Sequence, residues 1–139
     1  RVQQLDKGTL ATIWPYQPIW LDGAHNAHGA TALATTLRTI HDGRWNVICG
    51  ALNTRDPAEF LAPLVSLAGH VACLKIPDQD ASLSATAMRD AAKKLGMTAS
   101  PTKTLAAAFD QLDQNAPVII CGSLYLAGHI LWQNKTLPD

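Results

Sequence analysis

Four side chains of types that bind anions or nucleotides stand close behind short apolar segments of this chain. They are Asp22, His25, Arg55 and Ser123, and the apolar segments before them end at residues 21, 50 and 121. A guanidinium can hold a carboxylate or a phosphate with two hydrogen bonds, and a carboxylate can accept hydrogen bonds from ribose hydroxyls. The free N–H groups at the start of a helix attract phosphate. These residue types therefore predict a site for an anionic or nucleotide ligand.

Each of these residues also has a structural interpretation, which the sequence leaves open. Asp22 can fix its own loop, and His25 fits a plain loop position as well as a ligand contact. Asn26 is placed to cap the helix that we expect to begin at the next residue. Arg55 can be an exposed side chain, and Ser123 can cap the last helix.

Several motifs of known chemistry are absent from the sequence. Ser123 has no G-x-S-x-G context and no base paired to it in sequence, so we do not expect a serine hydrolase. Neither G-x-x-x-x-G-K-[ST] nor G-x-G-x-x-G occurs, so the main phosphate-binding loop of a kinase, an ATPase or a dehydrogenase is missing. His41, His70 and His129 lack partners at metal-ligand spacing, and His28 has the position of a solvent-facing residue. The chain thus carries half of a site and no predicted metal site.

The elements that must position these residues alternate along the chain. Apolar runs predict strands at residues 9–14, 19–21, 45–50, 71–76, 98–100 and 118–121. Helical spacing and capping signals predict helices from 27 to about 40, from 57 onward with a break at Pro63, over 85–95, over 105–112 and over 124–132. This alternation predicts a single Rossmann-like α/β domain with a mostly parallel sheet and helices on both faces. In such sheets ligands collect at the carboxyl ends of the strands, which is where the candidate residues stand.

Length and composition limit the classes of function. The chain has 139 residues, of which 47% are hydrophobic and 16% are charged, as expected of one globular domain. Eleven basic residues balance eleven acidic ones, and no segment suits a membrane-spanning helix, so we expect neither a nucleic-acid nor a membrane partner. The three cysteines fit buried free thiols in a reducing compartment, which predicts a cytoplasmic protein.

The segment I-W-L-D-G-A-H-N at 19–26 resembles the D-G-A-H-N signature that opens the C-terminal domain of folylpolyglutamate synthase and dihydrofolate synthase, in the Mur ligase superfamily. Three further segments are similar to the same family. They are R-V-Q at 1–3, Gly50 with Arg55-Asp56, and C-G-S-L-Y at 121–125. The resemblance spans the whole chain. It departs from the family at Ala27, where proline is usual, and in several extra residues before Asp22.

The resemblance implies that residues 1–139 are the C-terminal domain of a larger ATP-dependent amide ligase. Its N-terminal domain would carry the phosphate loop and most of the Mg²⁺ ligands. Such enzymes phosphorylate a carboxylate of dihydropteroate or of a folate, and the amino group of L-glutamate then displaces the phosphate. The implied partners are ATP, L-glutamate, the folate or dihydropteroate substrate and the N-terminal domain. The isolated chain is then expected to be inactive.

The resemblance also implies roles for single residues. Arg1 would contact an ATP phosphate, Asp22 the ribose or the amine side of glutamate, His25 the phosphate or glutamate region, and Arg55 a glutamate carboxylate. Asn26 and Ser123 join this ATP- and glutamate-binding set, and no residue is assigned as catalytic or as a metal ligand. Two alternatives stay open: the C-terminal domain of an amino-acid-adding peptidoglycan ligase, and a noncatalytic Rossmann-like nucleotide-binding module.

Overall fold

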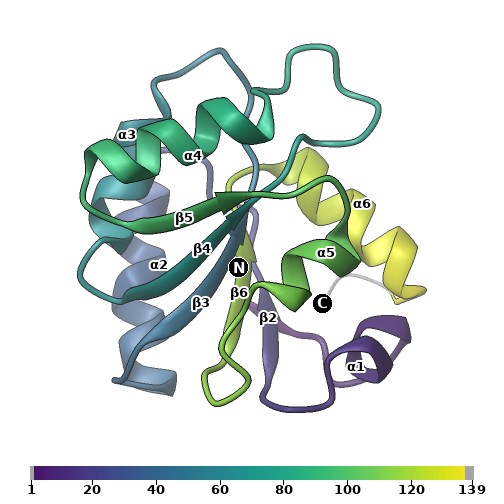
Figure 1. The fold of residues 1–139 in the computed structure, drawn as a ribbon. Coiled ribbons are helices and arrows are strands. Elements are labelled where there is room, and N and C mark those ends of the chain that lie inside the picture. Colours follow the sequence, from purple (N-terminus) through teal and green to yellow (C-terminus); the bar gives the residue numbers. More distant parts are fainter. Residues whose placement is uncertain (1, 137–139) are drawn as a thin grey trace.

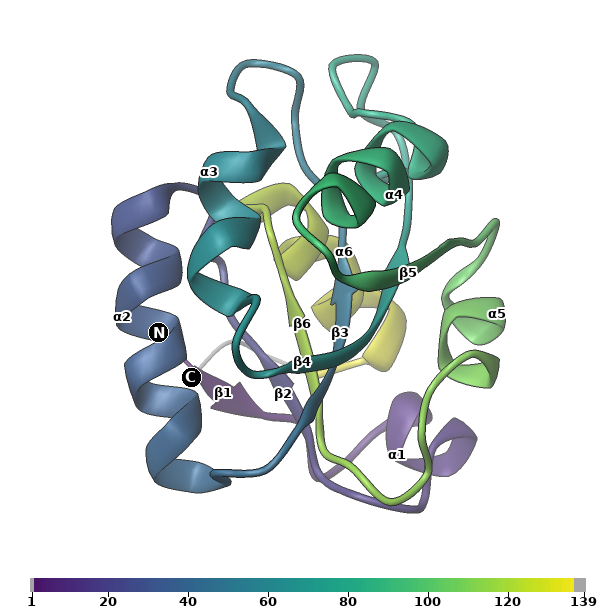
Figure 2. The ribbon, with the colours of Figure 1, turned by 60° about the vertical axis from the view of Figure 1, so that its left-hand side comes forward.

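A computed structural model describes residues 2–136, so Arg1 and its predicted phosphate contact lie outside the described residues. The strands form one six-stranded sheet in the order β1-β2-β6-β3-β4-β5 (Figures 1 and 2). Their bounds are β1 Gln3–Gln4, β2 Ile19–Leu21, β3 Trp45–Cys49, β4 Ala68–Cys73, β5 Thr98–Pro101 and β6 Val118–Cys121. Within the part of the chain that the structure describes, β1 runs antiparallel to β2 and all other neighbouring strands of the sheet are parallel. The predicted mostly parallel α/β sheet is confirmed.

The helices cover the sheet in two layers, one on each face (Figures 1 and 2). One face carries α2 (Ala27–Ile40), α3 (Pro57–Leu61), the 3₁₀ turn η1 (Ala62–Leu64) and α4 (Ala85–Lys94). The other face carries α1 (Thr9–Ile13), α5 (Leu105–Asp110) and α6 (Leu124–Asn134). Each layer buries its own apolar cluster against the sheet, and every residue of the central strands β3 and β6 is buried. Within residues 2–136, none of the helices has the length and apolar character needed to cross a membrane.

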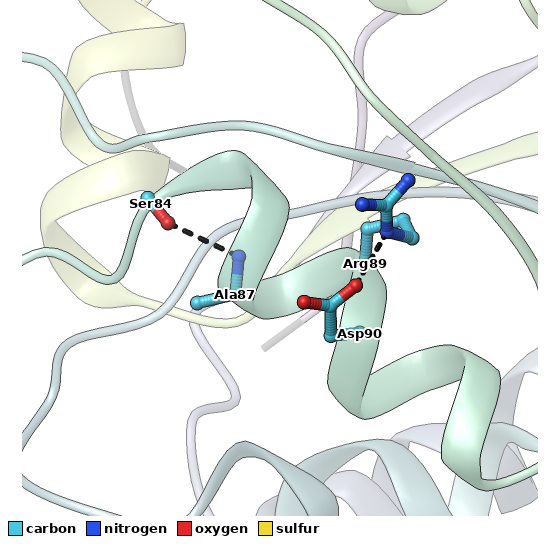
Figure 3. Close-up of polar contacts among 4 residues, drawn as sticks. All are labelled: Ser84, Ala87, Arg89 and Asp90. Carbon is cyan, nitrogen blue, oxygen red and sulfur yellow. Dashed lines mark hydrogen bonds and ion pairs between the residues drawn. The ribbon is translucent and has the colours of Figure 1, made fainter.

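Local capping signals account for where most helices begin. Asn26 accepts a hydrogen bond from the Gly29 N–H at 2.8 Å and starts α2, and Asp56 starts α3. Ser84 caps α4 through the Ala87 N–H at 3.0 Å (Figure 3). The predicted break at Pro63 is also confirmed, because α3 gives way there to η1.

Three sequence-based expectations about strands need correction. A strand is expected at residues 9–14, but residues 9–13 form the short helix α1, in which the Leu10 N–H donates to the Asn134 side chain. The antiparallel strand β1 was not predicted, because its two glutamines carry no strand signal. The strand expected at 71–76 runs instead over Ala68–Cys73. It starts earlier because pairing with β3 and β5 overrides the weak strand propensity of Ala68-Gly69-His70, and residues 74–76 lie beyond its end.

Candidate functional site

The sheet order brings together loops that lie far apart in sequence. Strands β2, β6 and β3 are neighbours, so the loops after them share the carboxyl edge of the sheet. These loops carry Asp22 and His25 after β2, Ser123 after β6, and Arg55 after β3. The convergence expected of the candidate residues is therefore present.

Three of the candidate residues line one partly open cavity of about 250 Å³, namely His25, Arg55 and Ser123. The rest of its wall is largely apolar. It consists of Ala51, Leu52, Pro57, Phe60, Leu124 and the ring of Tyr125, together with Thr54, Asp56 and Gly122. A cationic group beside such a wall interacts more strongly with an anion than it would in bulk water. The cavity can therefore hold a small ligand that has both an anionic group and an aliphatic part.

The other candidate residues line an open groove of about 710 Å³ next to this cavity. Asp22 and Asn26 face the groove along with His28 and the first turns of α2. His25 and Leu124 belong to both hollows and form the wall between them. The candidate set thus divides into two adjoining hollows with His25 at their boundary.

His25 is oriented by its own loop. Its Nδ1 lies 3.0 Å from the Gly23 carbonyl oxygen, so Nδ1 carries the proton and donates it to that oxygen. The ring is exposed, and among residues 2–136 no protein group makes a hydrogen bond with Nε2. Nε2 is therefore the atom of His25 available to a ligand.

Arg55 presents an exposed cation, and within the described part of the chain its side chain makes no ion pair. The neighbouring carboxylate of Asp56 is engaged elsewhere, because it caps α3 by accepting from the Ala58 N–H at 3.0 Å. The guanidinium thus keeps its hydrogen-bond donors for a ligand.

Asp22, Asn26 and Ser123 each hold part of the site in shape. Asp22 is only 7% exposed, and its Oδ2 accepts from the Ala24 N–H at 2.8 Å, which fixes the loop. Asn26 caps α2 as described above. Ser123 accepts from the Tyr125 N–H at 3.0 Å and so caps α6. The structural interpretation of these three residues is confirmed, and their ligand contacts stay predictions.

Backbone contacts lock the three loops to one another. The Gly122 N–H donates to the Ala24 carbonyl at 2.9 Å, which ties the loop after β6 to the loop after β2. Gly122 has a φ of +115°, and a Cβ added there would overlap the carbonyl oxygen of Gly50, in the loop after β3. Glycine is required at 122 by both the backbone angle and this close approach.

A row of thiols lies directly beneath the site. Cys121, Cys49 and Cys73 are register partners across β6, β3 and β4, and all three are buried and free. Burial raises the pKa of Cys121, while the hydrogen bond with Cys73 and burial raise the pKa of Cys49. The same hydrogen bond lowers the pKa of Cys73. These thiols belong to the core, in agreement with the sequence-based expectation of buried free cysteines.

Sequence reasoning missed the apolar wall of the cavity. Leu52, Phe60 and Tyr125 are ordinary apolar residues in sequence, and only the strand order shows that they face one space. Tyr125 had a usable signal, since it belongs to the C-G-S-L-Y segment. Among residues 2–136, no group of three or more His, Cys, Asp or Glu side chains is arranged to hold a metal ion.

Comparison with known proteins identifies the family. The model of the dihydrofolate synthetase C-terminal domain matches residues 14–133. The chain belongs to this family. The folylpolyglutamate synthase of Lacticaseibacillus casei is 29% identical over 136 residues, a match that covers 92% of this chain and 31% of that protein. The family resemblance seen in the motifs is thus confirmed.

Solved structures of family members have the same fold. The bifunctional folylpolyglutamate synthase/dihydrofolate synthase of Yersinia pestis, complexed with AMPPNP and a Mn ion, is 25% identical with a TM-score of 0.74. The match covers 94% of this chain and 30% of that chain. A bifunctional synthase with Mn, AMPPNP and L-glutamate bound is 25% identical, has a TM-score of 0.72, and is matched over 84% of this chain and 29% of that one. This chain therefore spans less than a third of the length of these relatives.

Proposed function

We propose that this chain is the C-terminal lobe of a larger ATP-dependent ligase that joins L-glutamate to dihydropteroate or to a folate. Family membership supports an enzyme of the folylpolyglutamate and dihydrofolate synthase type. The match covers less than a third of each relative, and the unmatched part of those proteins is long enough for an N-terminal lobe that supplies the phosphate loop.

The observation that carries the proposal is the shared cavity of His25, Arg55 and Ser123. Pockets for drug-sized ligands usually measure about 300–1,000 Å³. A cavity of about 250 Å³ suits a smaller molecule, such as an amino acid, better than a folate or a nucleotide. Arg55 would bind a carboxylate of glutamate with two hydrogen bonds, and the apolar wall would contact its methylene groups.

The neighbouring groove would face the nucleotide. It contains the start of α2, whose first N–H groups favour a phosphate, and Asp22, whose carboxylate is of a type that binds ribose hydroxyls. The family resemblance of the R-V-Q segment adds a phosphate contact from Arg1 to this proposal. His25 lines both hollows, and we assign it a contact in the phosphate or glutamate region.

The chemistry requires positive charge around a developing anion. A carboxylate oxygen of the pteroate or folate would attack the γ-phosphorus of ATP and release ADP. The glutamate nitrogen would then attack the acyl carbon and release phosphate. In this scheme Arg55 positions glutamate, His25 with a proton on both ring nitrogens donates from Nε2 to the developing anion, and the closed lobe excludes water. Mg²⁺ would neutralise phosphate charge, and because residues 2–136 offer it no ligand cluster, we assign its ligands mainly to the N-terminal lobe.

The first test is Arg55→Ala in the full-length enzyme. Loss of charge-assisted hydrogen bonds to glutamate raises the KM for glutamate about 10- to 100-fold and leaves the KM for ATP nearly unchanged. Arg89→Ala is the matched control, because Arg89 lies on α4 outside both hollows and pairs with Asp90 (Figure 3). A change confined to the KM for ATP contradicts the role assigned to Arg55.

In the same assay the isolated 139-residue chain shows no ATP hydrolysis or ligation, and measurable turnover contradicts the proposed division of functions between the two lobes.

A further inference from the structure

The loop at 77–83, after β4, is joined to the loop at 50–56 that carries Arg55. The Asn53 N–H donates to the Ala81 carbonyl at 2.7 Å, and the Leu83 N–H donates to the Ala51 carbonyl at 2.8 Å. Leu52 and Ser82 pair as an isolated antiparallel bridge between these two hydrogen bonds. The 77–83 loop, which looks featureless in sequence, therefore extends the sheet interactions beyond the ends of β3 and β4.

Ser82 holds the 77–83 loop in this position. Its hydroxyl oxygen accepts from the Ile76 N–H at 2.9 Å and its proton goes to the Leu83 carbonyl at 2.9 Å. The Ser82 N–H closes the turn onto the Gln79 carbonyl at 3.1 Å. One side chain thus connects the start of the loop to its end, at the place where the loop meets residues 51–53.

Arg55 depends on this support for its position. Its side chain is exposed and makes no hydrogen bond to another residue within 2–136, so its location follows from the backbone of its loop. That backbone is fixed at one end by β3 and at the other by the cap of α3 at Asp56. Between these ends, the hydrogen bonds at Ala51 and Asn53 are both made with the 77–83 loop.

We infer that the 77–83 loop is a strut that sets the position of Arg55, and that Ser82 is the positioning residue that keeps this strut in place. The inference rests on the proposed glutamate role of Arg55. Ser82 lines neither hollow, so it acts only through the 50–56 loop. If the strut loosens, Arg55 spends less time in the binding position, and the apparent affinity for glutamate falls by that fraction.

The test compares Ser82→Ala with Ser82→Thr in the full-length enzyme. Removal of the hydroxyl raises the KM for glutamate about 3- to 10-fold, with kcat and the KM for ATP within about twofold of wild type. Hydrogen exchange of the amides at 50–56 becomes faster by a similar factor. Ser82→Thr keeps the hydroxyl, so its KM for glutamate and its exchange rates at 50–56 stay close to those of the wild type. Insertion of two glycines after Gln79 is a second way to loosen the strut, and it has the same effect as Ser82→Ala.

Ser84→Ala is the matched control, because Ser84 also loses a hydroxyl that holds a backbone N–H but caps α4 instead (Figure 3). It lowers stability and leaves the KM for glutamate unchanged. The inference is wrong if Ser82→Ala and the insertion leave exchange at 50–56 unchanged, or if Ser84→Ala raises the KM equally. If Arg55→Ala leaves the KM for glutamate unchanged while Ser82→Ala still speeds exchange at 50–56, the glutamate role of Arg55 fails and the strut stands.

Discussion

Replacement of Gly122 by alanine tests the way in which the site is assembled. Gly122 follows β6 with a φ of +115°, and its N–H donates to the Ala24 carbonyl at 2.9 Å. A Cβ at this position overlaps the backbone oxygen of Gly50. The substitution therefore pushes apart the loops after β6 and β3, which together line the cavity.

The expected loss in the free energy of unfolding is large for the addition of one methyl group. A residue other than glycine held at such a φ costs about 1–3 kcal/mol. Relief of the overlap with Gly50 requires backbone shifts of the kind that overpacking causes, again about 1–3 kcal/mol. Backbone movement also weakens the hydrogen bond to Ala24, at about 1 kcal/mol. We expect Gly122→Ala to lower the free energy of unfolding by about 3–7 kcal/mol, out of about 5–15 kcal/mol for a typical domain.

Urea denaturation of the domain measures this loss, and Gly128→Ala is the matched control in the same region. Gly128 lies inside α6, and a Cβ added there meets no atom within 4 Å. That substitution stabilises the helix by about 0.5–1 kcal/mol, so the two alanine variants change stability in opposite directions. A Gly122→Ala protein within about 0.5 kcal/mol of wild type would refute the argument that glycine is required where the loops meet.

Two further predictions concern the end of α6 and strand β4. Asn134→Ala removes the side chain that accepts from the Leu10 N–H at 2.7 Å and leaves this buried donor unpaired. We expect urea denaturation to show that the free energy of unfolding falls by about 2–4 kcal/mol. Replacement of the exposed Asn115 by alanine, the control, should change it very little. Burial lowers the pKa of His70 from 6.5, so below about that pH the unfolded state takes up the proton first and stability falls. His70→Gln, which can still hydrogen-bond to Ser100, should show a smaller fall in Tm between pH 7.5 and 5.5, and an equal fall would contradict this role.

The parts of the fold that local chemistry decides were predictable from sequence. Asn26, Asp56 and Ser84 each carry an acceptor that bonds to a backbone N–H two or three residues later, and this is visible in the sequence. The buried strands β3 and β6 are short apolar runs between turn signals, so they were also found. In both cases the determining interaction lies within a few residues of the element.

The strand prediction for residues 9–14 was wrong because the determining interaction is a long-range one. The sequence T-L-A-T-I-W contains three β-branched residues and reads as a strand on propensity alone. The structure makes it a helix because the Asn134 side chain supplies a contact that no neighbour provides, accepting from the Leu10 N–H and donating to the Lys7 carbonyl. The partner lies 124 positions away in sequence. No local pattern contains that information, and tertiary contact overrides propensity here.

The site shows the same division between local and long-range information. Residue types and their places after strands predicted Asp22, His25, Arg55 and Ser123 as candidates, because the carboxyl ends of parallel strands share one edge. The partition into two hollows was not predictable, since it depends on β6 lying between β2 and β3. That order places Gly122 against Gly50 and makes His25 and Leu124 a common wall. Under the proposed function the two adjoining hollows take glutamate and the nucleotide, and the strand order, more than any single residue, creates them.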